Sequence, residues 1–547
     1  MKKQTNKGVS RRSFLKGAAA VAAATAASGV MAMADGEDVA PVAEEPVDEG
    51  PAWLGKAPGI TDEMCTETVD ADVVIVGAGA SGIAAARAAS EIEGVKVVVI
   101  ERMPEPTIRG LVFGCLDSQL HKDLGAEYDK QEVVNEICKA QGNRVNAALW
   151  TKWANESGAA FDWFASILDD SFTYFLEMWP NPDAYDNSTE LRKQYCTGIE
   201  FVDWIGAVTK QYEKSVEQGA EYLFNTMALE LCKEDGVVIG VYCQKEDGSY
   251  LKVNAKNGVS LNTGDYSYNE EMVKALCPEF YLATGGKVGT VPTSIGYGYK
   301  MGIWAGAMME PGPHAHMSHS FVGMMGLSNT ATLNLNLKGK RYMNEDCDGQ
   351  SFTNQIIRQP GRTGVQIWDS NWQDMIYHQA ISHGAPDPHK YDFEAKQKAL
   401  DAAVENPSPF LVGANTLEEL FEKMGLPVET AVASVKRYNE LCHGGKDLDF
   451  GKRMDRMYPI ETPPFFATRS FTAACIVTAG LVVDENLRVL DENYDPIPHL
   501  WAAGNVAGGR YAAEYPVAPV VATSHGTAFT FGRSIGYQMA AGDAKEE

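Results

Sequence analysis

The sequence predicts an α/β fold in which one domain, built on a parallel sheet, is interrupted by a second, inserted domain. Three observations support this prediction. A strand, a glycine-rich loop, a helix and a second strand follow one another within residues 70–101. Loop-forming residues gather in the middle of the chain, and short apolar strands return near its end. The 547 residues suffice for two or three domains with cores of their own.

The first observation rests on the residues around position 77. The β-branched run Val73–Val76 is typical of a buried parallel strand, and the loop Gly-Ala-Gly-Ala-Ser-Gly at 77–82 follows it directly. An Ala-rich helix is expected over Ile83–Ser90, and a second apolar strand then ends at Glu101. The alternative, a simple glycine-rich turn, does not account for this whole order.

Each part of this unit suits a dinucleotide. Gly77 permits a tight turn, Gly79 lets a pyrophosphate approach the backbone, and Gly82 allows close packing of helix and strand. The free N–H groups and positive dipole end of the helix attract phosphate. Glu101 stands where a carboxylate accepts hydrogen bonds from an adenosine ribose. We therefore predict a dinucleotide-binding domain.

The segments around this unit predict where the domain begins and what covers it. Residues 35–69 are acidic and Pro-rich, which predicts a linker. Residues 130–225 read as amphipathic helices rich in Trp and Phe, and strands are expected around a turn at Lys233–Gly236 and within 258–264.

The second half of the chain predicts the inserted domain. Residues 312–475 carry more loop signals and a cluster of Pro, Asn and His, which we interpret as an α+β domain. Strand patterns then return, followed by a helix that ends at Arg533. The first domain is thus expected to be discontinuous, over 70–311 and 476–547.

The N-terminus has the layout of an export signal. Paired arginines within Ser10–Lys16 precede a Gly/Ala-rich apolar stretch, and Ala32-Met33-Ala34 offers a small-x-small cleavage site. The alternatives are a basic amphipathic tail or a membrane anchor, but the stretch is short for a spanning helix. We predict that residues 1–34 are a twin-arginine signal and that the mature protein works in the periplasm, the cell envelope or outside the cell.

Charge narrows the range of partners. The signal carries six basic and no acidic residues, so its removal takes the net charge from −26 to −32. Such a surface repels nucleic acid and anionic lipid, and neither is an expected partner. It suits docking to a basic electron carrier or simple solvation. No later apolar segment is long enough to predict a membrane span in the mature chain.

The ten cysteines include no Cys-x-x-Cys pair. This spacing excludes ordinary c-type haem attachment, thioredoxin chemistry and the usual zinc or iron–sulfur motifs. A chain folded before export first meets a reducing cytosol, so we expect mostly free, buried thiols and an anaerobic setting. Electrons must then come from a separate donor, such as a cytochrome or a membrane redox protein.

Several motifs, in their order along the chain, resemble those of flavoproteins similar to the fumarate reductase and succinate dehydrogenase flavoprotein subunit. The motifs are Gly77–Gly82 with Glu101, Asn262–Gly264, Gly339–Glu345, Gly480–Asp484, Trp501–Asn505 and Ala528–Gly532. The resemblance implies FAD, bound covalently or non-covalently to a Rossmann-type (glutathione-reductase-like) domain, with a capping domain over 312–475. It also implies hydride transfer between flavin N5 and a C–C bond next to an electron-withdrawing group.

The resemblance assigns a set of residues to the cofactor. Residues 501–505 would approach the ribityl chain, and the helix beginning near Thr523 would direct its N-terminus at the N1/O2 edge of the flavin. The expected FAD residues are Gly77, Gly79, Ala80, Ser81, Gly82, Glu101, Arg102, Ala228, Thr263, Gly264, Gly504, Asn505, Ser524 and His525.

Departures from the fumarate-specific pattern exclude fumarate as the expected substrate. The position of the Arg proton donor corresponds to Gly349, and a substrate-binding His is replaced by Ile476. Without these cations a C4 dicarboxylate has little to hold it. The flavin-side loop Met103–Gly114 also lacks the usual Gly-Gly/Ser-Thr pattern.

The C-terminal motifs are similar to those of the family members that act on 3-ketosteroids and other enones. There a Tyr donates to the carbonyl oxygen, and the matching residue is Tyr515, with Val517 in place of the family's Gly. A phenol can polarise a ketone without bringing a charge into an apolar pocket. The alternative is a structural tyrosine.

A second cluster contains His314, His316 and His319. The resemblance places a substrate-facing His near this point, so His316 is a catalytic candidate, with His319 as an alternative. A surface loop is a further interpretation. Three histidines on an expected loop are thin support for a metal, and we predict none. Arg341 and Glu345 are expected to brace the capping domain.

Together these features predict an exported FAD-dependent oxidoreductase that reduces an activated C=C bond in a small organic acceptor, an enone or enoate. Hydride would pass from flavin N5 to the β-carbon, while Tyr515 or a cap His protonates the α-carbon or holds the carbonyl. The first alternative is the reverse reaction, a 3-ketosteroid-type dehydrogenase. The second is a flavin electron carrier or redox sensor without a small substrate.

Overall fold

The computed structural model describes residues 50–179, 194–289, 291–322, 331–377, 392–408, 410–512, 514–515 and 517–542. The chain divides into two compact units, residues 1–50 and 51–547, and every element below belongs to the second. The expected signal, residues 1–34, lies outside the described residues.

The central sheet is parallel along most of its width, as predicted. Within the described residues its strand order is β17-β18-β11-β2-β3-β7, and only β17 runs antiparallel to its neighbour. The strands are β2 (Val73–Val76), β3 (Val97–Ile100), β7 (Glu221–Leu223), β11 (Val259–Leu261), β17 (Arg488–Leu490) and β18 (Pro496–Ala502). Because β2 and β3 are buried on both faces, they read as continuous apolar runs.

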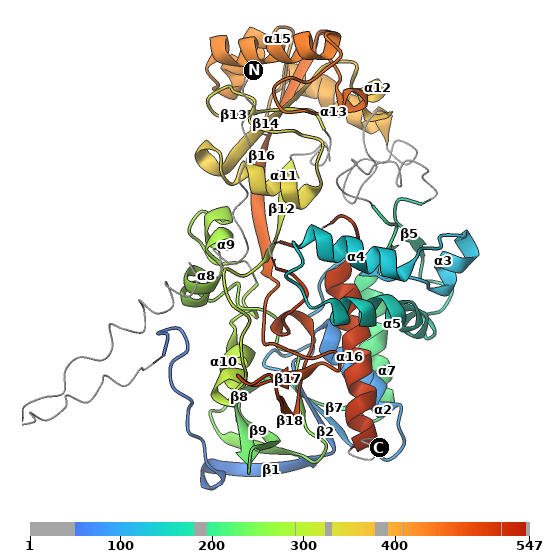
Figure 1. The fold of residues 1–547 in the computed structure, drawn as a ribbon, viewed down its shortest axis with the longest axis vertical. Coiled ribbons are helices and arrows are strands. Elements are labelled where there is room, and N and C mark those ends of the chain that lie inside the picture. Colours follow the sequence, from blue (N-terminus) through green and yellow to red (C-terminus); the bar gives the residue numbers. More distant parts are fainter. Residues whose placement is uncertain are drawn as a thin grey trace, which may run out of the picture. The chain divides into compact units, whose positions relative to one another are not determined.

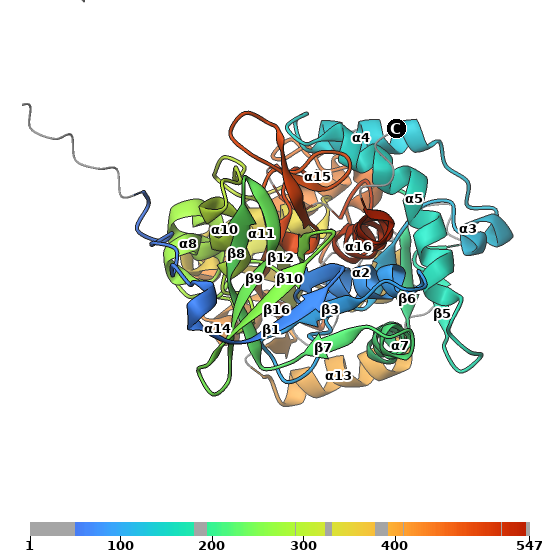
Figure 2. The same ribbon diagram turned by 90° about the horizontal axis from the view of Figure 1, so that it is seen from below.

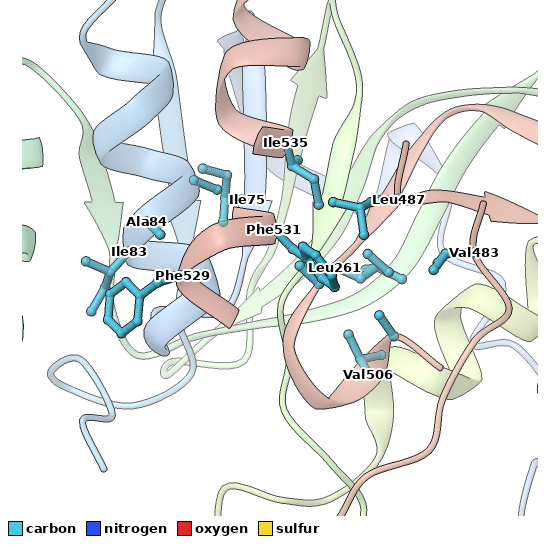
Figure 3. Close-up of a cluster of buried hydrophobic side chains, with 14 of the residues drawn as sticks. Ile75, Ile83, Ala84, Leu261, Val483, Leu487, Val506, Phe529, Phe531 and Ile535 are labelled. Carbon is cyan, nitrogen blue, oxygen red and sulfur yellow. The ribbon is translucent and has the colours of Figure 1, made fainter. Parts of the chain in front are cut away.

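Helix α2 (Ala80–Ser90) joins β2 to β3 and packs against α16 (Thr523–Ala541), as Figures 1 and 2 show. Figure 3 shows the core between them, where Ile83 and Ala84 of α2 lie beside Phe529 of α16. Both helices are longer than predicted. The Ser-Gly pair at 81–82 resembles a loop, yet these residues form the first turn of α2. Helix α16 continues past Arg533 because its next turns are also buried.

A second sheet, in the order β1-β10-β9-β8, contains the predicted turn at 235–236 between two of its strands. The strands are β1 (Cys65–Ala71), β8 (Thr226–Glu234), β9 (Val237–Lys245) and β10 (Tyr250–Ala255). The linker prediction is wrong for the last residues of 35–69. There the 3-10 helix η1 (Asp62–Met64) leads into β1, an edge strand whose exposed polar residues resemble a linker in composition.

A three-stranded sheet and helices flank this core. The described residues within 130–225 form the expected helices and also three short strands, one of which is β7 of the central sheet. The elements are β4 (Val112–Gly114), α3 (Gln119–Leu124), α4 (Lys130–Ala140), α5 (Ala147–Ala165), β5 (Tyr174–Leu176), β6 (Gly198–Phe201), α7 (Trp204–Glu217), α8 (Glu270–Leu276), α9 (Pro278–Ala283) and α10 (Tyr297–Trp304).

Residues 316–477 form a fourth sheet with its own helices, labelled in the upper half of Figure 1. Two long strands, β12 and β16, pair antiparallel and run from this sheet toward the central core. The strands are β12 (His316–Val322), β13 (Leu333–Asn336), β14 (Thr363–Trp368), β15 (Leu411–Ala414) and β16 (Phe465–Val477). The helices are α11 (Gly349–Ile356), η2 (Pro360–Arg362), α12 (Trp372–Tyr377), α13 (Phe393–Glu405), α14 (Leu417–Met424), α15 (Val428–His443) and η3 (Met454–Arg456).

This sheet has apolar clusters separate from the main core, around Phe421 and around Trp368. The guanidinium of Arg341 lies between the carboxylates of Glu345 and Asp447, with Nη2–O distances of 2.9 Å to each, and all three side chains are buried. Arg341 and Glu345 are therefore paired inside the fourth sheet's layer, as expected of bracing residues.

All ten cysteines lie in the described residues, and no disulfide joins them. Six of them are buried. No helix in the described part of the chain is long and apolar enough to cross a membrane.

Candidate active site

A pocket of about 540 Å³ lies where β2, β3 and β11 end and where α2 and α16 begin. Ligands of open parallel sheets bind at this carboxyl edge. Every residue that the sequence assigned to FAD lines the pocket except Gly82. The short helix η4 (Gly504–Val506) brings two of them, Gly504 and Asn505, to the pocket from the far end of the chain.

The turn from β2 into α2 has no space for a side chain at Gly77 or Gly82. Gly77 adopts a φ of +106°, and a Cβ on Gly82 would lie 1.9 Å from the carbonyl oxygen of Gly77. The N-cap of α2, Gly79, offers no side chain to the free N–H groups of the first turn. These N–H groups and the helix dipole make the site suitable for a diphosphate.

Glu101 is held in place at the end of β3. One carboxylate oxygen accepts a hydrogen bond from the N–H of Ala78 at 2.8 Å, and the other accepts one from the N–H of Met103 at 2.8 Å. A carboxylate has about four acceptor positions, so capacity remains for ribose hydroxyls. The neighbouring Arg102 donates to the carbonyl oxygen of Pro292 at 2.7 Å.

Two polar atoms at the end of β11 lack a hydrogen-bond partner within the described residues. They are Asn262 Oδ1 and Thr263 Oγ1, both buried. Buried polar atoms are normally paired, so such atoms beside a pocket indicate that a polar ligand completes them. The glycine turn, the acidic residue and these atoms together fit a bound dinucleotide.

The opposite wall is the start of α16. Ser524 and His525 line the pocket there, and the N-cap, Ala522, has no side-chain cap to offer. Burial and the nearby Arg109 guanidinium lower the pKa of His525 to about 4, so its ring is neutral at neutral pH. The helix N-terminus therefore favours negative charge in a ligand without a charged imidazole.

The end of the pocket toward the fourth sheet is neutral. Met317 of β12 and the run Ala474–Ile476 of β16 line it. Among the described lining residues the charged side chains are Glu101, Arg102 and Arg109, and none of these belongs to β12 or β16. Ile476, where the fumarate-specific pattern has His, is 6% exposed.

The two predicted catalytic residues lie just behind the pocket wall. The Tyr515 hydroxyl accepts a hydrogen bond from the N–H of Ser524 at 3.2 Å, and the N–H of Tyr515 donates to the carbonyl oxygen of His316 at 3.2 Å. Burial raises the pKa of Tyr515. Both side chains are buried, and neither is among the pocket-lining residues.

The histidine cluster separates in space. His314 Nδ1 lies 2.5 Å from the Tyr266 hydroxyl, and its Nε2 lies 2.9 Å from the carbonyl oxygen of Glu310. Both ring nitrogens of His316 lack a partner in the described part of the chain. The side chain of His319 lies outside what the structure describes. No described group of three or more His, Cys, Asp or Glu residues is arranged to hold a metal ion.

Sequence reasoning did not assign Arg109, Met317 or Cys475 to the site. Arg109 had a signal, because it lies in the loop 103–114 that departs from the pattern of similar flavoproteins. Cys475 also had a signal, because it directly precedes Ile476, where the fumarate-specific pattern has a substrate-binding His. Met317 had none, since it reaches the pocket only because β12 and β16 pair, with Met317 opposite Ile476.

Residues 72–518 match the FAD binding domain family. The chain belongs to this family. The flavoprotein also carries a twin-arginine translocation signal, matched at residues 8–28, and is exported by that route. The predictions of FAD, of an FAD-dependent oxidoreductase and of the export signal are thereby confirmed.

Two curated relatives and one solved structure illustrate the likeness. The flavoprotein is 28% identical to the vinyl phenol reductase of Lactiplantibacillus plantarum over 86% of this chain and 96% of that protein. It is 26% identical to a fumarate reductase (cytochrome) of Shewanella frigidimarina over 81% of this chain and 73% of that protein. The 3-ketosteroid-Δ4-(5α)-dehydrogenase of Rhodococcus jostii RHA1 shares the fold, with a TM-score of 0.67 and 22% identity over 88% and 99% of the two chains.

His316 gives the first testable prediction, which concerns stability. Burial lowers its pKa from 6.5 to about 4. Between pH 6.5 and 4 the imidazole therefore binds a proton in the unfolded state and stays neutral in the folded state. The free energy of unfolding should fall by up to about 3 kcal/mol from this group between pH 6.5 and 4. His316→Leu should remove this part of the pH dependence in chemical denaturation.

Phe280→Leu provides the control, because the Phe280 ring packs edge-on against His316, with centroids 6.4 Å apart, and does not titrate. This variant should lower stability equally at all pH values. An unchanged pH slope in His316→Leu would show that the imidazole does not stay neutral in the folded state.

Proposed function

We propose that the flavoprotein reduces the activated C=C bond of a neutral organic acceptor, an enone or an uncharged enoate, with electrons from a separate redox partner. The central sheet would act as a Rossmann-type (glutathione-reductase-like) FAD domain and residues 312–475 as the cap. The observation that carries this proposal is the neutral end of the pocket, at Met317 and Ala474–Ile476. A dicarboxylate placed there would find no cation among the described pocket-lining residues of β12 and β16.

The relatives support this reaction class. One is named for reducing a vinyl phenol and another for reducing fumarate, and both names describe reduction of a C=C bond. Once bound and reduced by the redox partner, FAD would supply hydride from N5 to the β-carbon of such a bond. The protein's own residues then have to position the acceptor, exclude water and deliver a proton.

Tyr515 is the proposed proton donor or carbonyl-polarising residue. Its hydroxyl accepts from the Ser524 N–H, so its own proton remains available for a second hydrogen bond. Ser524 lines the pocket, which places the phenol one hydrogen bond behind the wall. Apo structures often hold catalytic groups at such longer distances. His316, whose ring nitrogens have no partner among the residues that the structure describes, is the second candidate.

The reverse reaction, dehydrogenation of a 3-ketosteroid, is the second candidate function. The Tyr515 motif and the fold shared with a ketosteroid dehydrogenase favour it. Both directions use the same site, so only the redox partner and the substrate decide between them. An electron carrier without a small substrate is less well supported, because the pocket extends past the FAD residues to β12 and β16.

Anaerobic reoxidation tests the proposal. The mature protein is loaded with FAD, reduced with a dithionite-reduced viologen, and mixed with enones, enoate esters, vinyl phenols, steroids and fumarate. Rapid reoxidation by a neutral acceptor, with fumarate inactive, is the expected result. Bleaching of the oxidised flavin by a saturated ketosteroid would support the dehydrogenase, and reoxidation by fumarate alone would overturn the role given to the neutral pocket end.

A further inference from the structure

Arg109 occupies the loop between β3 and β4 that departs from the pattern of similar flavoproteins. Its backbone is fixed, because its carbonyl oxygen accepts a hydrogen bond from Trp204 Nε1 at 2.7 Å. The Trp204 ring in turn contacts the ring of His525 at the start of α16, with centroids 5.2 Å apart. The Arg109 side chain lines the pocket and is 36% exposed.

The carboxylate of Asp265 forms an ion pair with this arginine. Its side chain is fully buried just after β11, and its Oδ1 accepts from the N–H of Ser267 at 2.7 Å. Its Oδ2 lies 3.5 Å from Asn505 Nδ2 and 3.9 Å from Arg109 Nη2. Burial raises the pKa of Asp265, and the Arg109 guanidinium acts in the opposite direction. One carboxylate oxygen thus connects Arg109 with Asn505, a residue assigned to FAD.

The Arg109 guanidinium keeps donors for a ligand. At 3.9 Å the contact with Asp265 is an ion pair without a direct hydrogen bond, and no described residue accepts a hydrogen bond from this side chain. A guanidinium has five N–H donors in a fixed fork. The other lining arginine, Arg102, donates to the carbonyl oxygen of Pro292, its buried Nε has no partner among the described residues, and His525 is neutral. Arg109 is therefore the lining cation whose guanidinium has no described hydrogen-bond acceptor.

We propose that Arg109 is a cofactor-positioning residue whose guanidinium, held by Asp265, binds an anionic group of FAD. Two groups share this chemistry, the diphosphate and the negatively charged edge of the reduced isoalloxazine. A buried carboxylate this close to the cofactor would repel either anion, so Asp265 and Arg109 should act with opposite signs.

The test measures FAD affinity of the apoprotein and the two-electron potential of the holoprotein. If Arg109 binds the diphosphate, Arg109→Gln weakens FAD binding at least about tenfold at unchanged potential. If it binds the reduced ring, the potential falls by about 30 mV or more, which is a tenfold change for a two-electron couple. Asp265→Asn should move the same quantity in the opposite direction.

Arg437→Gln is the matched control, because Arg437 is exposed on α15 and paired with Asp449 there. It should change neither quantity. The proposal is overturned if Arg109→Gln folds normally by circular dichroism, changes the FAD affinity by less than about twofold and changes the potential by less than about 9 mV, the equivalent of twofold. Because Arg109 is partly exposed, this variant decides the question even if Asp265→Asn fails to fold.

Discussion

Gly82→Ala should abolish FAD binding. The new Cβ would lie 1.9 Å from the Gly77 carbonyl oxygen and 3.0 Å from its carbonyl carbon, both backbone atoms of the turn that we propose faces the diphosphate. Either α2 moves away from β2 or the turn opens, and overpacking of this kind costs about 1–3 kcal/mol or more. We expect flavin content below about a tenth of wild type after anaerobic reconstitution, measured by the absorbance of protein-bound flavin.

Gly94→Ala separates this effect from glycine replacement in general. Gly94 adopts a φ of +82° in the turn before β3, and a Cβ there meets no atom within 4 Å. Its replacement should cost about 1 kcal/mol of backbone strain and leave flavin content unchanged. Full flavin content in Gly82→Ala would mean that the close approach of helix and strand is not what shapes the site.

Tyr515→Phe should lower the rate of acceptor reduction about 100-fold or more while flavin content and the rate of flavin reduction by viologen stay near wild type. Loss of a positioned proton donor typically costs two to four orders of magnitude. The variant also leaves the Ser524 N–H without its acceptor, which costs about 1 kcal/mol of stability. Stopped-flow reoxidation of the reduced enzyme measures the relevant step directly.

Tyr511→Phe is the matched control. Tyr511 is buried in the same cluster, with its ring centroid 5.2 Å from that of Tyr515, and its hydroxyl lies 2.9 Å from Thr523 Oγ1. It loses one hydrogen bond of similar type, so stability should fall similarly and reoxidation should stay within a few-fold of wild type. Equal rate losses in both variants would assign Tyr515 a structural role, and His316 would become the residue to test.

Structural elements that are determined by residues close together in the sequence are the easiest to predict from it. The strand–loop–helix–strand unit is recognisable because Val73–Val76, the glycines and Glu101 each serve a local requirement. The limits of α2 and α16 are less certain, since Ser81 and Gly82 resemble a loop until the packing against Gly77 is known. The linker prediction failed at β1 because its pairing with β10 joins segments about 185 residues apart, and composition carries no trace of that pairing.

The pocket, too, combines residues that local motifs predict with residues that long-range pairing brings in. The residues assigned to FAD come from motifs and line one pocket together, Gly82 aside. Met317 reaches that pocket through the long-range pairing of β12 with β16, which no short pattern marks. Arg109 lies in a loop whose unusual sequence is its only signal. The neutral end of the pocket could be expected from Ile476 alone, but its other residues could not.

The pocket is lined by residues from Val76 to Ala528, drawn from strands and helices spread over most of the chain. A nascent chain on the ribosome therefore lacks part of the cofactor site until its last helix has been made. FAD can be enclosed only after α16 has been synthesised, when the N-terminal signal is already accessible. The twin-arginine route carries folded proteins, so it suits a cofactor site that is completed this late.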